Sequence, residues 1–98
     1  MKLESFVESL KEAQPPSNLP PLLKALWYDG KEDWANAHQI VETRSDAESN
    51  RIHAYLHRKE GDQWNAAYWY NRAGATMPEY SLEEEWEQLV RTYLGNGA

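Results

Sequence analysis

Apolar side chains in this chain recur three and four residues apart, and no segment alternates polar and apolar residues over the length of a strand. Leu3, Phe6, Val7 and Leu10 show the pattern at the start of the chain. This spacing places apolar side chains on one face of a helix, whereas a half-buried strand needs alternation with a period of two. The pattern therefore predicts an all-α fold without a sheet.

Capping residues and prolines divide the chain into five or six helices. Prolines at 15–16 and 20–21 separate the first helix from the second, because a proline amide cannot bond inside a helix. Candidate N-cap side chains precede the later helices at Asp33, Ser45 or Asp46, Asp62 and Ser81. We read residues 1–98 as a single helical domain, since 41% hydrophobic residues with five Trp and six Tyr suffice for a packed core.

Charge and composition narrow the classes of function. Sixteen acidic residues against ten basic ones give a net charge of −6, which disfavours a nucleic-acid partner because phosphate contacts need clustered Lys and Arg. No apolar run approaches the ~20 residues of a membrane-spanning helix, so we expect no membrane partner. The chain has no cysteine, and we expect a cytoplasmic location.

A shift of 30 residues aligns two helical hairpins of similar design. The shift pairs Leu26 with Leu56, Trp34 with Trp64, Ala37 with Ala67, and His38 with Tyr68. Such internal repetition predicts stacked helix-turn-helix units. We expect the last helix to cover the second hairpin and the first helix to cover the other, as capping helices do in stacked repeats.

The second hairpin carries a more specific pattern. Gly61 and Asp62 are followed by Ala66, Tyr70, Ala73 and Pro78. Over residues 61–78 this spacing resembles the tetratricopeptide repeat. The resemblance implies a helical hairpin that binds another macromolecule. His57 departs from the family, which usually has an aromatic residue there, and the first hairpin lacks the full series.

A second resemblance rests on a longer string. His53 to Asp62 reads HAYLHRKEGD, and residues 65–74 follow with the form NAxYWYxRAG. Together these are similar to a signature of short uncharacterised microbial proteins. That resemblance covers most of residues 25–78 and implies no activity.

The apolar stripes also predict a core. We expect one core that contains Trp34, Ala37, Leu56, Trp64, Ala67, Tyr68, Trp86 and Leu89. Truncating Trp64 to alanine is then expected to cost about 3–5 kcal/mol. Glu83 to Glu85, at the start of the last helix, are expected to be solvated partners of the helix dipole.

Three histidines and a glutamate form a candidate polar site. His53, His57 and Glu60 share one strip of the fourth helix, because residues three, four and seven apart lie on one face. His38 should approach this strip from the third helix, with Glu42 four residues further on. Two imidazoles at i and i+4 can ligate a transition metal, so His53 and His57 are candidate metal ligands. We expect a hydrogen-bonded structural network instead, because the sequence supplies neither a cluster of acidic ligands nor a nucleophile motif.

Aromatic rings and arginines around the fifth helix predict a binding surface. One helix cannot bury four neighbouring rings, at 64 and 68–70, in one direction. Trp69 beside Arg58 or Arg72 would form a hot spot for a peptide. We expect Arg58 itself to face solvent or an acidic neighbour.

Two functions of different classes remain open. The first is a helical-repeat-like interaction module without enzymatic activity or cofactor, which binds a protein or peptide partner or a second copy of itself. Its candidate binding residues are His38, His53, His57, Arg58, Glu60, Trp69 and Arg72. The alternative is a small metal-binding or catalytic helical protein that uses His38, His53, His57 and Glu60. We assign no catalytic residue.

Overall fold

A computed structural model describes residues 1–95, which form six helices and no strand. The helices are α1 (Leu3–Ser9), α2 (Pro21–Gly30), α3 (Trp34–Glu42), α4 (Ala47–Lys59), α5 (Gln63–Ala73) and α6 (Leu82–Gly95). The prediction of an all-α fold with five to six helices is confirmed. Within the same residues, no helix is both long enough and apolar enough to cross a membrane.

The expected capping residues set most helix boundaries. Asp33, Asp46 and Asp62 each accept a hydrogen bond from the backbone amide three residues later, at 3.3, 3.0 and 3.2 Å. Ser81 does the same for Glu84 at 3.0 Å. Gly61 has a φ of +88° after the end of α4, a conformation that glycine adopts without strain. The first helix ends at Ser9, well before the prolines.

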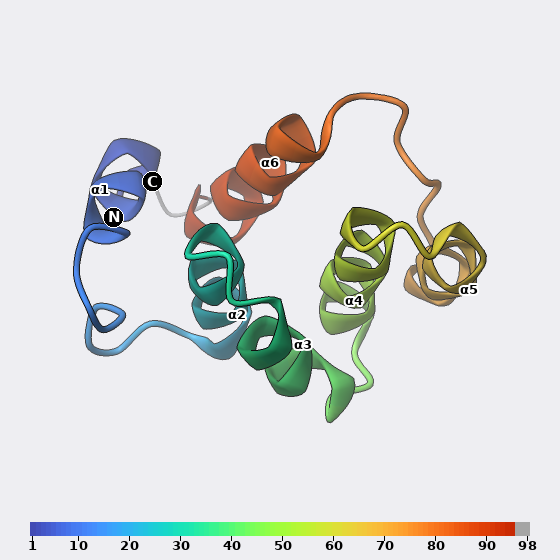
Figure 1. Cartoon of the computed structure of the whole chain (residues 1–98), viewed down its shortest axis with the longest axis horizontal. Helices are drawn as coiled ribbons and strands as arrows, with labels where there is room; N and C mark the ends of the chain where they lie inside the picture. The colour runs from blue at the N-terminus through green and yellow to red at the C-terminus, as the bar shows by residue number, and fades with distance from the viewer. Residues whose placement is uncertain (96–98) are drawn as a thin grey trace.

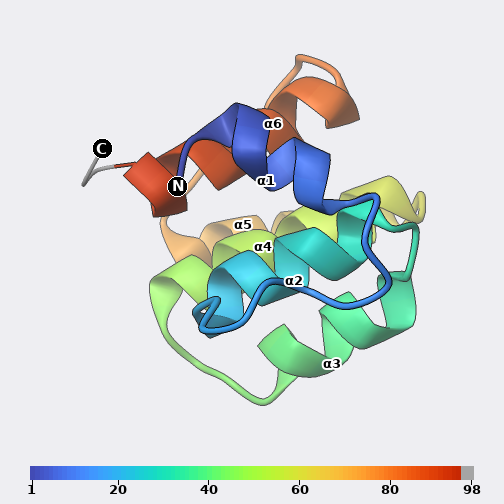
Figure 2. The ribbon, with the colours of Figure 1, turned by 90° about the vertical axis from the view of Figure 1, so that its left-hand side faces the viewer.

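The helices form two hairpins, α2 with α3 and α4 with α5, which meet where α3 packs against α4. Helix α6 packs across α2 and α4, and α1 packs against α6 (Figures 1 and 2). The two terminal helices therefore lie together over α2 and α4, instead of covering opposite ends as expected. Helix α5 is left at the edge of the molecule (Figure 1).

The core lies mainly between α2, α4 and α6. Its buried members are Phe6, Leu23, Ala25, Leu26, Trp27, Ala37, Val41, Ile52, Tyr55, Leu56, Leu89 and Val90. The expected Ala37, Leu56 and Leu89 are among them, and Trp34 and Trp86 are partly buried against them. A smaller cluster of Ala54, Ala66 and Tyr70 joins α4 to α5.

The expected burial of Trp64, Ala67 and Tyr68 is wrong. Trp64 is 81% exposed, Tyr68 is 46% exposed, and Ala67 is exposed as well. The repeat alignment carried the buried face of α3 onto α5, but α3 is covered by both α2 and α4. Helix α5 packs against α4 through Ala66 and Tyr70, and the chain then turns away to α6.

We predict opposite effects for two aromatic truncations on α5. Tyr70→Ala removes a ring that is 1% exposed and should cost about 3–5 kcal/mol, whereas Trp64→Ala should change stability by less than about 0.5 kcal/mol. Urea unfolding followed by circular dichroism measures both. A large loss for Trp64→Ala would contradict the burial described for α5.

Candidate functional site

Three histidine rings converge between α3 and α4. His38 extends from α3, and His53 and His57 lie one turn apart on α4. Each ring offers a nitrogen, and the three nitrogens lie within 4.8 Å of one another. The Nε2 atoms of His38 and His53 are 3.0 Å apart, and the rings of His53 and His57 stack with centroids 4.9 Å apart. The predicted approach of His38 to the strip on α4 is confirmed.

Two carboxylates hold the outer nitrogens of this cluster. His57 Nδ1 lies 2.6 Å from Glu60 Oε1, and His38 Nδ1 lies 3.2 Å from Glu42 Oε1. A carboxylate oxygen accepts a hydrogen bond from an N–H group. These contacts therefore favour the tautomers in which Nδ1 carries the proton. The Nε2 lone pairs of His38 and His57 are then free to accept a hydrogen bond or to bind a cation.

His53 is left with an unsatisfied nitrogen. Because His38 Nε2 is an acceptor, His53 must donate its Nε2 proton across the 3.0 Å contact, which leaves His53 Nδ1 unprotonated. That Nδ1 atom is buried and has no hydrogen-bond partner. A buried polar atom without a partner is costly and requires an explanation. The expected structural network is therefore incomplete at its most buried ring.

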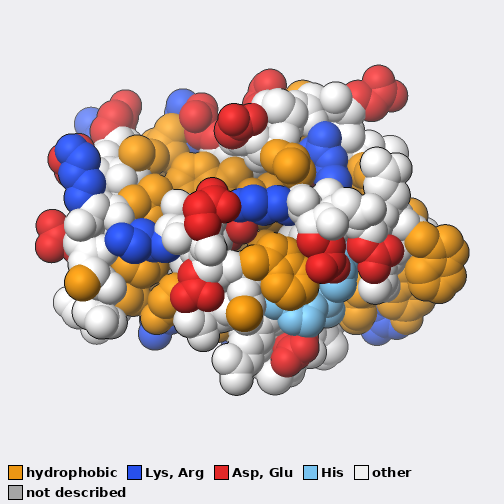
Figure 3. All heavy atoms as spheres, viewed as in Figure 1, with side chains coloured by type: hydrophobic (Ala, Val, Ile, Leu, Met, Phe, Trp, Pro, Cys, Tyr) orange, Lys and Arg blue, Asp and Glu red, His pale blue; other side chains and the backbone are white. Residues whose placement is uncertain are grey.

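Two tryptophans form the walls of the cluster. Trp34 stacks on His38 with a centroid distance of 4.6 Å and an interplanar angle of 9°. Trp69, from α5, stacks on His53 at 4.0 Å and 15°. The histidines nevertheless reach the surface beside acidic side chains (Figure 3). Three helices thus hold the rings in place while leaving an approach from solvent.

Burial keeps two of these rings neutral. Burial, together with the neighbouring His38 and His57, lowers the pKa of His53 to about 4. Burial also lowers the pKa of His38, against the opposing effect of Glu42. Near neutral pH both rings are therefore uncharged, which is the state in which an imidazole nitrogen binds a metal.

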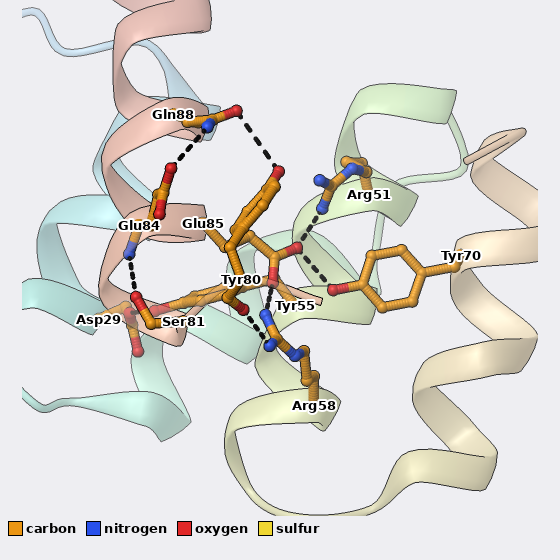
Figure 4. Close-up of polar contacts among 10 residues, drawn as sticks. All are labelled: Asp29, Arg51, Tyr55, Arg58, Tyr70, Tyr80, Ser81, Glu84, Glu85 and Gln88. Carbon is orange, nitrogen blue, oxygen red and sulfur yellow. Dashed lines mark hydrogen bonds and ion pairs between the residues drawn. The ribbon is translucent and has the colours of Figure 1, made fainter. Parts of the chain in front are cut away.

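Arg58 belongs to a different part of the molecule. It donates to Glu85 Oε1 at 2.6 Å and to the backbone oxygen of Tyr80 (Figure 4). Glu85 is fully buried, and its Oε2 accepts bonds from Arg51 and from the Tyr70 hydroxyl, both at 2.5 Å. The acidic neighbour expected for Arg58 is confirmed, but the expected solvation of Glu85 is wrong. The spacing of Arg51 and Arg58, seven residues apart on α4, places two cations on one helix face. This spacing is the sequence feature that could have indicated a shared acidic partner.

The other candidate residues adjoin the histidines. Trp69 contacts His53 directly, and the Arg72 guanidinium lies 5.4 Å from the centroid of the Trp69 ring. The structure thus pairs Trp69 with Arg72, whereas Arg58 is occupied by Glu85. Of the seven candidate residues, six form one contiguous group and Arg58 stands apart.

No family model matches the chain, and no curated protein or solved structure matches it either. The resemblances to tetratricopeptide repeats and to short microbial proteins therefore remain predictions. Inferences about function rest on the site itself.

We predict that His53 makes stability depend on pH. Its pKa falls from 6.5 unfolded to about 4 folded, so between these values only the unfolded state binds the proton. The folded state should therefore lose about 2 kcal/mol of stability between pH 7 and pH 5 through this group. Urea unfolding in EDTA, with His53→Gln as the matched control, measures the effect. Equal losses in both proteins would contradict this role of His53.

Proposed function

We propose that this protein binds a divalent transition-metal ion, with zinc as the reference case, through His38, His53 and His57. The observation that carries the proposal is the convergence of three ring nitrogens, with carboxylates on the outer nitrogens of two rings. Imidazole suits zinc and its neighbours, and histidine ligands commonly donate their second N–H to a carboxylate or carbonyl.

The spacing of the rings suits such an ion. Metal–nitrogen bonds of about 2.0–2.1 Å at tetrahedral angles place ligand nitrogens about 3.3 Å apart. The His38 and His53 Nε2 atoms are 3.0 Å apart, so a small rotation of the rings would admit the ion. His53 would then carry its proton on Nδ1, for which the described residues provide no acceptor, and the Nε2–H bond between the rings would be replaced by two metal–nitrogen bonds.

In this proposal Glu60 orients a ligand ring. It contacts the Nδ1 of His57, so it orients that ring from outside and is not itself a ligand. Within residues 1–95 no fourth histidine or carboxylate lies close to all three ring nitrogens. Water or a small molecule would complete a tetrahedral ion, as in sites whose metal exchanges ligands. A catalytic use of this fourth coordination position belongs to the same proposal.

Zinc titration of EDTA-treated protein tests this function. We predict one zinc ion per chain, and a loss of affinity of at least 100-fold in His38→Ala and His53→Ala. Glu60→Gln should weaken binding about 10–100-fold, the range for outer partners of metal ligands. Calorimetry measures affinity, and the cobalt-substituted protein reports tetrahedral nitrogen ligation by its visible absorption.

Glu84→Ala provides the matched control, because Glu84 lies in the exposed first turn of α6 and should leave zinc affinity unchanged. Circular dichroism establishes that each variant is folded. Binding well below one equivalent, or equal affinity in the histidine variants, would refute the proposal.

The helical-repeat interaction module is the second candidate function. The exposed Trp64 and Tyr68 on α5 favour it, because large aromatic side chains grouped on a surface are typical of binding sites. A protein or peptide partner, and the cytoplasmic location expected from the sequence, are part of this proposal.

A further inference from the structure

The outer face of α5 is an aromatic surface without a covering helix. Trp64 is 81% exposed and Tyr68 is 46% exposed, with the exposed Ala67 between them. The opposite face of α5, with Ala66 and Tyr70, packs against α4. Figure 3 shows hydrophobic side chains projecting at the edge where Figure 1 places α5. One helix therefore presents an unpartnered apolar face.

The equivalent face of α3 shows what such a surface contacts. Trp34, which the 30-residue shift aligns with Trp64, donates its indole N–H to the Leu56 carbonyl oxygen on α4 at 2.8 Å. Ala37, aligned with Ala67, is fully buried in the same packing. The outer face of the first hairpin is thus closed by a helix of the second hairpin.

The same contact recurs at the other end of the stack. Leu26, aligned with Leu56, accepts a hydrogen bond at 2.9 Å from the indole N–H of Trp86 on α6. The fold therefore uses an indole donor and a helix carbonyl twice to join one helix to another. Trp64 is the equivalent donor of the second hairpin, and within residues 1–95 its indole has no such acceptor.

We infer that the outer face of α5 docks an amphipathic α-helix of a partner protein, which continues the packing of the first hairpin on the second. The docked helix places a backbone carbonyl at the Trp64 indole and apolar side chains over Ala67 and Tyr68. This inference rests on the second candidate function and is independent of the metal site.

A second copy of this chain does not fit the same contact. In a head-to-tail stack, Trp64 of one copy would need the Leu26 carbonyl of the next, and Trp86 already bonds that oxygen. Helix α2 is covered by α3, α4 and α6. This head-to-tail stack is therefore closed, and we take a separate helix as the occupant.

Charge adds one requirement for the partner. In the described part of the chain, the exposed Arg72 contacts the Tyr68 hydroxyl and the rings of Tyr68 and Trp69, and no carboxylate pairs with it. A docked helix can provide that carboxylate beside its apolar stripe. The inferred partner is an amphipathic helix with an acidic residue next to the apolar face.

Nuclear magnetic resonance with a defined peptide tests the inference. The probe is a capped synthetic peptide of residues 46–60, the helix that covers Trp34 within the chain. Titrated into the ¹⁵N-labelled full chain, it should shift the Trp64 indole N–H resonance saturably and leave those of Trp34 and Trp86 in place. Trp64→Ala should weaken binding at least 10-fold. Trp64→Phe keeps a ring but removes the donor, so its affinity for the peptide should lie between those of the unmodified chain and Trp64→Ala.

Three results would overturn the inference. The first is the absence of any saturable shift at Trp64 up to millimolar peptide. The second is binding that maps to the histidines or to Trp34, which would keep an interaction role but place it elsewhere. The third is a dimer in sedimentation without peptide that Trp64→Ala dissociates, because a second copy would then cover α5.

Discussion

The buried carboxylate of Glu85 is the interaction on which the arrangement of the helices depends. It is fully buried, and it bonds Arg51 and Arg58 from α4 and Tyr70 from α5 (Figure 4). A carboxylate in such a place is tolerated only when it is paired and hydrogen-bonded, and removing it would leave two largely buried guanidinium groups without their counter-charge, a loss that costs about 3–5 kcal/mol. The network therefore holds α6 in one position against the second hairpin.

That position of α6 explains why the first hairpin is covered and why the outer face of α5 is not. With Glu85 held at α4, the next residue, Trp86, lies over α2 and bonds the Leu26 carbonyl. Helix α6 thus closes the first hairpin and leaves the outer face of α5 uncovered. Helix α4 connects the two regions, because its arginines meet α6 while His53 and His57 meet α3 on another side. The histidine cluster and the exposed aromatic surface are two consequences of one packing.

Much of the site followed from spacing along the helices. His53, His57 and Glu60 had to share a strip of α4, since residues separated by three or four positions lie on one helix face. The short connection between α3 and α4 then brought His38 to them. Sequence alone did not show that His53 would keep an unpaired nitrogen, or that Trp69 would stack on it. Those features depend on how α5 packs, which no local pattern specifies.

The sequence by itself determined the helices, the caps at Asp33 and Asp62, a cap at Ser45 or Asp46, and the pairing of neighbours into hairpins. These features depend on contacts within a few residues, where periodicity and capping chemistry act. The tertiary structure alone decided which face of α5 is buried and where Glu85 lies. Helix α5 is apolar on two faces, so burial of either Trp64 or Tyr70 satisfies its local pattern equally well. Packing against α4 buries the face with Ala66 and Tyr70, and the Tyr70 hydroxyl then bonds Glu85 of α6, 15 residues away along the chain.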